Sequence, residues 1–215
     1  WLLYLLQPPL DGLFNGRQLE VPFAPFPYQL EGIAFLVPRH GALLADEMGL
    51  GKTAQAILAL RLLFHQGVIQ RALVVCPKPL VHNWSRELKM WAPDIPFETF
   101  DGDPDQRRTL WLVSNCPLKL VNYETLTRDV ELATDPRVQF DLVVLDEATY
   151  PVRYGWIPLE EFLGVLRERP PHVHVVVTGR EAPEALLDLA DTVTEMRKVK
   201  HAFDQGVPAQ RGIEH

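Results

Sequence analysis

The chain has 215 residues, of which 47% are hydrophobic and 23% are charged, and its formal net charge is −7. This length allows one sizeable α/β core or two small domains, and the composition is ordinary for a globular protein. The acidic balance argues against a stand-alone nucleic-acid-binding protein, because phosphate contacts require a basic face. No apolar run reaches transmembrane length, so we expect no membrane association. Cys76 and Cys116 lack metal-type spacing and are interpreted as buried reduced thiols of a cytoplasmic protein.

Helical and strand patterns alternate along the chain, with prolines marking many of the boundaries. The segment 140–147 shows almost no alternation of apolar and polar residues, as expected for a strand covered by helices on both faces. The order predicts an α/β fold with a mostly parallel sheet in a three-layer α/β/α arrangement. In chain order, the predicted elements are helix 27–37, strand 41–46, helix 52–65, strand 71–77, helix 80–91, strand 97–102, helix 103–113, strand 118–123, strand 140–147, helix 159–170, strand 172–179, helix 182–191 and strand 192–199.

The stretch LLADEMGLGKTAQAI carries the strongest functional signal. A strand leads into a glycine-rich loop and a helix begins there, so that backbone N–H groups and the helix dipole face an anion. Lys52 is predicted to reach the β- and γ-phosphates, and the Thr53 hydroxyl to ligate Mg²⁺. Asp46 stands where the strict pattern has glycine, and the alternative is an ordinary glycine-rich turn. The predicted nucleotide-binding residues of the loop are Gly49, Leu50, Gly51, Lys52 and Thr53.

Two acids, Asp146 and Glu147, end the apolar strand 140–147. Asp146 is predicted to hold Mg²⁺, usually through water, and Glu147 to orient or deprotonate a water as the catalytic residue. Alone, such a pair is a common helix-capping pattern. Combined with the glycine-rich loop, it predicts a P-loop NTPase of the RecA-like kind that binds ATP or ADP together with Mg²⁺.

Up to Glu147 the chain resembles the first motor lobe of Swi/Snf-type helicase-like ATPases. The motifs that carry this resemblance are PYQLEGIAFL, ADEMGLGKTAQAI, ALVVCPKPLVHNWSREL and LVNYETL, in this order from about Pro25. The resemblance implies that Gln29 contacts adenine and that the last two motifs border a DNA track. No second motor lobe follows to supply arginines to the γ-phosphate, so we expect weak or no hydrolysis and no DNA binding.

From Thr149 onward the sequence resembles the C-terminal part of ATP:corrinoid adenosyltransferases, through RYGWIPLEE, VVVTGR, APEALLDLADTVTEMR and KHAFDQGVPAQRGIE. That family's own phosphate loop and corrinoid-side elements are missing, so we expect neither adenosyl transfer nor corrinoid binding. The resemblance implies that strand 172–179 lies between strands 41–46 and 140–147, which interleaves the two halves. We therefore interpret residues 1–215 as one engineered chimeric domain, with a helicase-like half (1–147) and an adenosyltransferase-like half (148–215).

Arg180 has two interpretations that the sequence leaves open. It ends strand 172–179, where it could approach the phosphates, or it could be a strand-end arginine paired with Glu181 or Glu184. His172 and His174 share one face of the same predicted strand. Because no third ligand accompanies them, we interpret them as strand residues and not as a metal site.

The tryptophans of the predicted helices, Trp84, Trp91 and Trp111, are interpreted as packing anchors, because few basic residues interleave with them for nucleic-acid stacking. Surfaces that a second lobe would cover are expected to be apolar and to favour self-association. His215 is either native or the first residue of a tag. The predicted function is binding of Mg-ATP or Mg-ADP. The alternatives are residual corrinoid adenosyl transfer and a folded chimera that binds no nucleotide.

Overall fold

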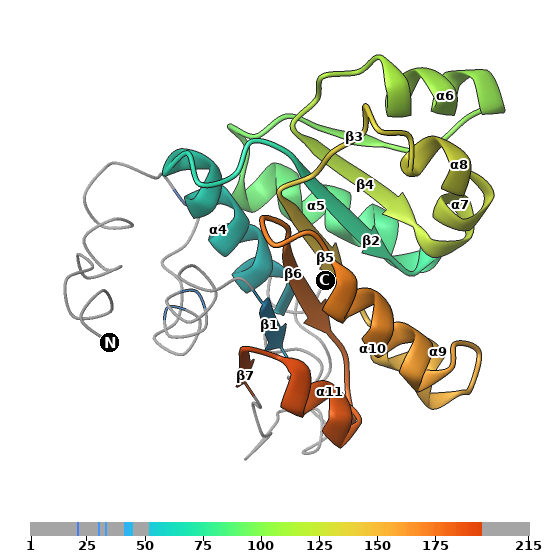
Figure 1. Cartoon of the computed structure of the whole chain (residues 1–215). Helices are drawn as coiled ribbons and strands as arrows, with labels where there is room; N and C mark the ends of the chain where they lie inside the picture. Colours follow the sequence, from blue (N-terminus) through green and yellow to red (C-terminus); the bar gives the residue numbers. More distant parts are fainter. Residues whose placement is uncertain (1–20, 22–29, 31–32, 34–40, 45–51, 195–215) are drawn as a thin grey trace, which may run out of the picture.

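The computed structural model of the chain describes residues 21, 30, 33, 41–44 and 52–194 (Figure 1). The predicted helix 27–37 lies mostly outside these residues, although Leu30 and Ile33 within it are helical. The last part of the predicted strand 192–199 lies outside them as well.

Seven parallel strands form one sheet in the order β3-β4-β2-β5-β6-β1-β7. Each overlaps a predicted strand, so the strand predictions are confirmed with shorter bounds. Because all strands run in one direction, their carboxyl ends share one edge of the sheet. The strands are β1 (Gly41–Leu44), β2 (Ala72–Cys76), β3 (Phe97–Thr99), β4 (Leu118–Asn122), β5 (Leu142–Leu145), β6 (His174–Thr178) and β7 (Thr192–Thr194).

Helices connect these strands, and local sequence signals set several of their ends. The first helix after β1 is closed by Gly67, whose φ of 69° is a left-handed conformation that glycine adopts without steric cost. Another begins at a capping box between Asp103 and Gln106. The helices are α4 (Lys52–His65), the 3₁₀ turn η1 (Lys78–Leu80), α5 (Val81–Trp91), α6 (Pro104–Leu112), α7 (Tyr123–Arg128), α8 (Val130–Ala133), α9 (Thr149–Arg153), α10 (Leu159–Glu168) and α11 (Glu184–Leu189).

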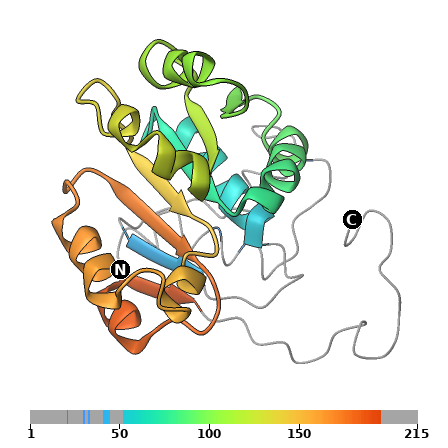
Figure 2. The same ribbon diagram turned by 90° about the vertical axis from the view of Figure 1, so that its right-hand side faces the viewer.

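The core has two sides, separated by the sheet. Alternate residues of β2 face opposite sides: Val74 belongs to the buried cluster that includes α4 and α5, whereas Val75 packs in a cluster with Trp111 of α6. On the side of α6, a third cluster joins Leu163 of α10 and Leu186 of α11 to Val177 of β6. Figure 2 shows the sheet between α4 and α5 on one side and α10 and α11 on the other. The predicted three-layer α/β/α fold is confirmed.

The strand β6 lies between β1 and β5, as the resemblance implied. Leu44 of β1 stands opposite Thr178 of β6, and Leu145 of β5 stands opposite Val177. Both neighbours of β1 in the sheet, β6 and β7, come from the sequence after Glu147. The strand that leads into the glycine-rich loop is therefore hydrogen-bonded to the C-terminal part of the chain.

Three short helices, α7, α8 and α9, occur where the sequence patterns assigned none. α7 begins at Asn122, whose side-chain oxygen accepts a hydrogen bond from the Thr125 backbone N–H at 2.8 Å. α9 tolerates Pro151 because this residue lies in the first turn, where a backbone N–H is not needed. Among the described residues, no helix is long and apolar enough to span a bilayer.

Candidate functional site

The predicted site residues divide into two groups. The first group flanks or forms the glycine-rich loop, where Lys52 is the first residue of α4 and Thr53 is half-buried in its first turn. The second group, Asp146, Glu147 and Arg180, lies at the carboxyl ends of β5 and β6 and is described in full. The predicted residues that lie outside the described part of the chain are Gln29, Gly49, Leu50 and Gly51.

Asp146 directly follows β5 and is only 5% exposed. Both oxygens of its carboxylate accept a hydrogen bond. The indole Nε1 of Trp84 in α5 donates to Oδ2 at 2.8 Å, and the hydroxyl of Thr178 at the end of β6 donates to Oδ1 at 2.6 Å. The carboxylate is thus held by one donor from each part of the chain, and both donors are uncharged.

The backbone of Asp146 is fixed as firmly as its side chain. Its N–H donates to the carbonyl oxygen of Val75 in β2 at 2.8 Å, and its carbonyl oxygen accepts a hydrogen bond from the Tyr123 hydroxyl at 2.9 Å. We call Trp84, Tyr123, Asp146 and Thr178 the Asp146 cluster. Its members come from α5, α7, the end of β5 and β6, so four separate elements position a single carboxylate.

Glu147 has a backbone φ of 55°, in the left-handed region that non-glycine residues seldom adopt. Thr178 holds this conformation from both ends of the peptide. Its hydroxyl accepts the Glu147 N–H at 3.0 Å, and its carbonyl oxygen accepts the Ala148 N–H at 2.9 Å. The strain is on the order of 1–3 kcal/mol, and such strain persists only where surrounding contacts impose it. Thr178 therefore sets the orientation of both predicted acids.

Close contact between β6 and α9 depends on a glycine. Thr149 is fully buried, and its hydroxyl accepts the Arg180 backbone N–H at 2.9 Å. A Cβ atom at Gly179 would lie 2.1 Å from the Thr149 Oγ1 atom, far inside van der Waals contact. Only glycine permits this approach, which places the start of α9 against the end of β6.

The structure changes one of the two interpretations of Arg180. Glu181 pairs with Arg153, whose Nη1 lies 2.7 Å from the Glu181 carboxylate, and the described residues contain no ion pair of Arg180 with Glu181 or Glu184. The strand-end pairing was therefore wrong. Within the same residues the buried Nε of Arg180 has no hydrogen-bond acceptor. Contact of Arg180 with phosphate stays a prediction.

Two ionisable groups beside Asp146 have raised pKa values. Cys76, fully buried at the end of β2, has its thiol pKa raised from 9.0 to about 12 by burial, and then by the negative charges of Asp146 and Glu124. Burial, followed by the charge of Asp146, also raises the pKa of the Tyr123 hydroxyl. Burial is the largest cause of both shifts, and the negative charge of Asp146 adds to it.

The residues present fit a Mg²⁺ ion. The buried Asp146 carboxylate receives only uncharged donors, and the described part of the chain gives it no ion pair with Lys, Arg or His. An unpaired buried charge is costly, and a bound cation would remove this cost. Carboxylate and hydroxyl oxygens, as on Asp146 and Thr53, are the ligands that Mg²⁺ prefers.

The three helix tryptophans are packing residues, as predicted. Trp84, Trp91 and Trp111 are 1%, 9% and 1% exposed. Each indole N–H also donates to a carboxylate, which no sequence pattern indicated; the acceptor is Asp146 for Trp84, Glu87 for Trp91 and Asp129 for Trp111. A helix tryptophan carries no local signal that says which acid it will meet, so Trp84 could not be assigned to the site.

Other predictions need correction. His172 lies in the turn before β6, so it does not share a strand face with His174. No group of three or more His, Cys, Asp or Glu residues that could hold a metal ion occurs among the residues that the structure describes. Cys116 is half-buried and not fully buried; it lies in the short connection before β4, and its thiol donates to the Leu118 carbonyl oxygen at 3.6 Å.

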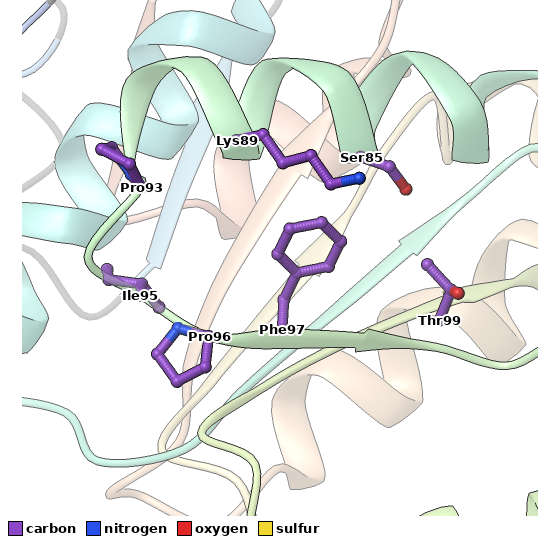
Figure 3. A pocket seen from close by; sticks show the side chains of 8 residues that line it. Ser85, Lys89, Pro93, Ile95, Pro96, Phe97 and Thr99 are labelled. Carbon is purple, nitrogen blue, oxygen red and sulfur yellow. The ribbon is translucent and has the colours of Figure 1, made fainter.

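A groove of about 640 Å³ opens elsewhere, between the last turns of α5 and the edge strand β3. Figure 3 shows Lys89 and Ser85 on the helix facing Phe97 on the strand. No residue predicted for the nucleotide site lines it. The lining residues are Ser85, Lys89, Ala92, Pro93, Ile95, Pro96, Phe97 and Thr99.

The fold defines the class of the protein as a RecA-like P-loop α/β protein. The Sulfolobus solfataricus SWI2/SNF2 ATPase core in complex with dsDNA superposes with a TM-score of 0.62 at 22% identity, over 80% of this chain and 37% of that chain. The Pyrococcus furiosus Hef helicase domain gives a TM-score of 0.63 at 17% identity, over 87% and 41% of the two chains. At these identities the likeness concerns the fold alone.

Residues 28–150 match the family model of the SNF2-related domain, which is more than half of the chain, so the chain belongs to the SNF2-related domain family. Residues 122–215 match a second model, the ATP:corrinoid adenosyltransferase BtuR/CobO/CobP. The two matches overlap across residues 122–150, which contain β5 and the two acids. Sequences of two families are thus joined in one chain, near the predicted junction.

Individual relatives show the same division. Corrinoid adenosyltransferase CobA of Salmonella typhimurium is 57% identical over 75 residues, which are 35% of this chain and 38% of that protein. The DNA repair and recombination protein RAD54B of Gallus gallus is 36% identical over 137 residues, 56% of this chain and 15% of that protein. The ISWI chromatin-remodeling complex ATPase ISW1 of Saccharomyces cerevisiae is 31% identical over 172 residues, which are 76% of this chain and 15% of that protein. The chain spans well under half of each curated relative.

Proposed function

We propose that the chain binds Mg-ATP or Mg-ADP at the carboxyl edge of β1 and β5. The observation that carries this proposal is the Asp146 carboxylate, buried to 5% exposure and oriented through both oxygens by uncharged donors. A buried carboxylate that only uncharged groups hold, as among the described residues, is costly unless a cation joins it. The SNF2-related family match over residues 28–150 supports an adenine nucleotide as the ligand that brings the cation.

The roles of the residues follow from their chemistry. The backbone of Gly49, Leu50 and Gly51 would cradle the phosphates, and Lys52 would neutralise their charge at the start of α4. Thr53 and Asp146 would hold Mg²⁺, which screens the phosphate charge when it is bound. Gln29 would contact the adenine, and Arg180 would extend from the end of β6 toward the phosphates.

Hydrolysis is proposed to be slow. Glu147 would orient or deprotonate the attacking water, and its backbone is already held in a defined conformation by Thr178. An arginine supplied by a second lobe typically contributes about 10³–10⁵ in rate to such reactions. Residues 122–215 match the adenosyltransferase model, so we do not include DNA-driven translocation in the proposed function.

The test is a titration of the wild type and of Lys52→Ala with AMP-PNP in the presence of Mg²⁺. We expect the wild type to bind and Lys52→Ala to lose most of the affinity, because the lysine charge faces the phosphates. Lys89→Ala is the matched control, since Lys89 is an exposed lysine that lines the groove between α5 and β3. Equal affinity in wild type and Lys52→Ala would leave only a folded chimera without a nucleotide site.

A second candidate, residual corrinoid adenosyl transfer, is favoured by the 57% identity to CobA over 75 residues. It would need a reduced cobalt centre placed against the ribose of ATP. The test is formation of an adenosylated corrinoid from ATP and reduced cobalamin. Product above the no-enzyme control would establish this activity, and its absence would leave nucleotide binding alone.

The origin of the chain is proposed to be deliberate recombination of two P-loop proteins. The overlap of the family matches across β5 supports this, because a splice within a shared strand preserves one structural element. A continuous reading frame across residue 147 in natural genomic DNA would contradict it.

The two free cysteines are consistent with a reducing compartment such as the cytoplasm.

Self-association is proposed through an aromatic surface that follows the two acids. Tyr154 is 61% exposed and Trp156 is 74% exposed, and their rings stack with centroids 5.6 Å apart. Tyr150 extends this stack at 6.1 Å from Tyr154. We expect Trp156→Ser to lower the apparent mass in light scattering, while Val113→Ser, at a similarly exposed valine that follows α6, leaves it unchanged.

A further inference from the structure

The indole of Trp84 is hydrogen-bonded to the carboxylate that is predicted to hold the metal. Its Nε1 donates to the Asp146 Oδ2 atom at 2.8 Å, and the side chain is 1% exposed. A packing tryptophan needs only an acceptor of any kind, such as a backbone carbonyl. Here the acceptor is the one carboxylate that the sequence assigns to Mg²⁺.

The hydrogen bond restricts what the carboxylate can do. An ionised carboxylate has about four lone-pair positions, and in Asp146 one on each oxygen is taken. Thr178 fixes Oδ1 and Trp84 fixes Oδ2, so the carboxylate cannot rotate about its terminal bond. The positions that stay open for a metal-bound water therefore point in defined directions.

The two donors differ in what anchors them. Thr178 belongs to β6, the neighbouring strand in the same sheet. Trp84 belongs to α5, the helix that follows β2, and packs in the buried cluster that also contains α4. Trp84 thus links the carboxylate at the end of β5 to the helical layer that begins at Lys52.

We infer that Trp84 is a positioning residue for the Mg²⁺ that accompanies the nucleotide, acting through Asp146. This inference rests on the proposed function. Hydrogen bonds to a metal-ligating carboxylate orient it, and their loss typically lowers metal affinity by about 10–100-fold. The indole N–H of Trp84 orients the Asp146 carboxylate so that its oxygens can accept a hydrogen bond from a Mg²⁺-bound water. The other contacts of the nucleotide do not depend on this hydrogen bond.

The chain offers a matched control. Trp111 is also 1% exposed, and its Nε1 also donates to a buried aspartate, Asp129, at 3.2 Å. Trp111→Phe therefore removes the same atoms and the same type of hydrogen bond as Trp84→Phe. Asp129 lies between α7 and α8 and is not predicted to hold metal.

The experiment measures AMP-PNP affinity in excess Mg²⁺ and in EDTA for the full chain, and takes the ratio of the two as the Mg²⁺ enhancement. We expect Trp84→Phe to lower the enhancement by roughly tenfold and to leave the affinity in EDTA unchanged. Trp111→Phe should keep the wild-type enhancement. An unchanged enhancement in Trp84→Phe overturns the inference and leaves the proposed function intact.

The experiment also distinguishes a failure of the proposed function from a variant that does not fold. If the wild type binds no AMP-PNP under either condition, the proposed function fails and the inference fails with it. If Trp84→Phe does not fold, the same ratio is measured after replacing Trp84 by 3-benzothienylalanine, whose bicyclic ring keeps the shape but lacks the N–H. A wild-type enhancement in that variant overturns the inference, and a tenfold loss supports it.

Discussion

Asp146 and Asp129 are both 5% exposed, and each accepts a hydrogen bond from a buried tryptophan. They differ in their remaining donors. Asp129 receives Arg107 in a forked ion pair, with Nε at 2.8 Å and Nη2 at 3.1 Å. Asp146 receives the Thr178 hydroxyl, and the described residues give it no ion pair. The charge of Asp129 is paired within the described residues, whereas these residues give Asp146 no countercharge, which agrees with the proposed Mg²⁺ site.

The two aspartates differ in the charge of their partners, as the proposed Mg²⁺ site at Asp146 requires. A structural acid brings its own countercharge and stabilises the folded state as a pair. A functional acid is oriented by neutral groups, so that its charge remains available to a ligand. The Asp129 group also lies within one part of the sequence, residues 102–129, whereas Asp146 draws its donors from both parts.

Truncation after Glu147 should have the largest effect, because it removes a partner of Asp146 and none of Asp129. It removes Thr178 from Asp146, and it also removes β6 and β7, which are both sheet neighbours of β1. All partners of Asp129 remain in the fragment. We expect the fragment to lose AMP-PNP binding and cooperative thermal unfolding, as measured by titration and circular dichroism. Wild-type affinity in residues 1–147 would show that the C-terminal part does not build the site.

A substitution at Gly179 should disturb the surroundings of Asp146 and leave those of Asp129 unchanged. The Cβ of Gly179→Ala would lie 2.1 Å from Thr149 Oγ1, next to Thr178, so we expect a loss of about 1–3 kcal/mol in the free energy of unfolding. Gly164→Ala is the control, because a Cβ there meets nothing within 4 Å in the interior of α10. That variant should gain about 0.5–1 kcal/mol. Similar denaturation midpoints for the two variants would contradict the close approach.

A further effect concerns pH. The folded protein holds the Cys76 proton up to a pKa of about 12, whereas an unfolded thiol loses it near 9.0. Between these values the unfolded state binds fewer protons, so the free energy of unfolding falls as pH rises, by at most about 1.4 kcal/mol per unit. Cys76→Ala should remove this component from a series of urea denaturation curves. Cys116→Ala, at a half-buried thiol, should remove less. Equal slopes in wild type and Cys76→Ala would contradict a burial effect beside Asp146.

Much of the fold could be predicted from the sequence, because the buried strands are continuous apolar runs and the long helices have clear ends. The position of β6 between β1 and β5 came from a family resemblance, since no local pattern orders the strands of a sheet. α9 was missed because Pro151 was not recognised as a first-turn residue. Short helices such as α7 and α8 show too few periods to be recognised.

The site was predictable in part, for a physical reason. Asp146 and Glu147 end an apolar strand, which is visible in the sequence. Their partners Trp84 and Thr178 stand 62 and 32 positions away from Asp146, and only the folded sheet brings them together. The left-handed backbone of Glu147 has no sequence signal at all, because it is imposed by Thr178.

The most direct test compares thermal melts of wild type, Asp146→Asn and Asp129→Asn, each with and without Mg-ATP. We predict that Asp129→Asn is destabilised, because the half-buried Arg107 loses its countercharge, yet still responds to Mg-ATP. Asp146→Asn should melt close to the wild type without nucleotide and should not be stabilised by Mg-ATP. An Asp146→Asn variant as unstable as Asp129→Asn, or one that Mg-ATP stabilises as much as the wild type, would contradict a carboxylate held ready for a cation.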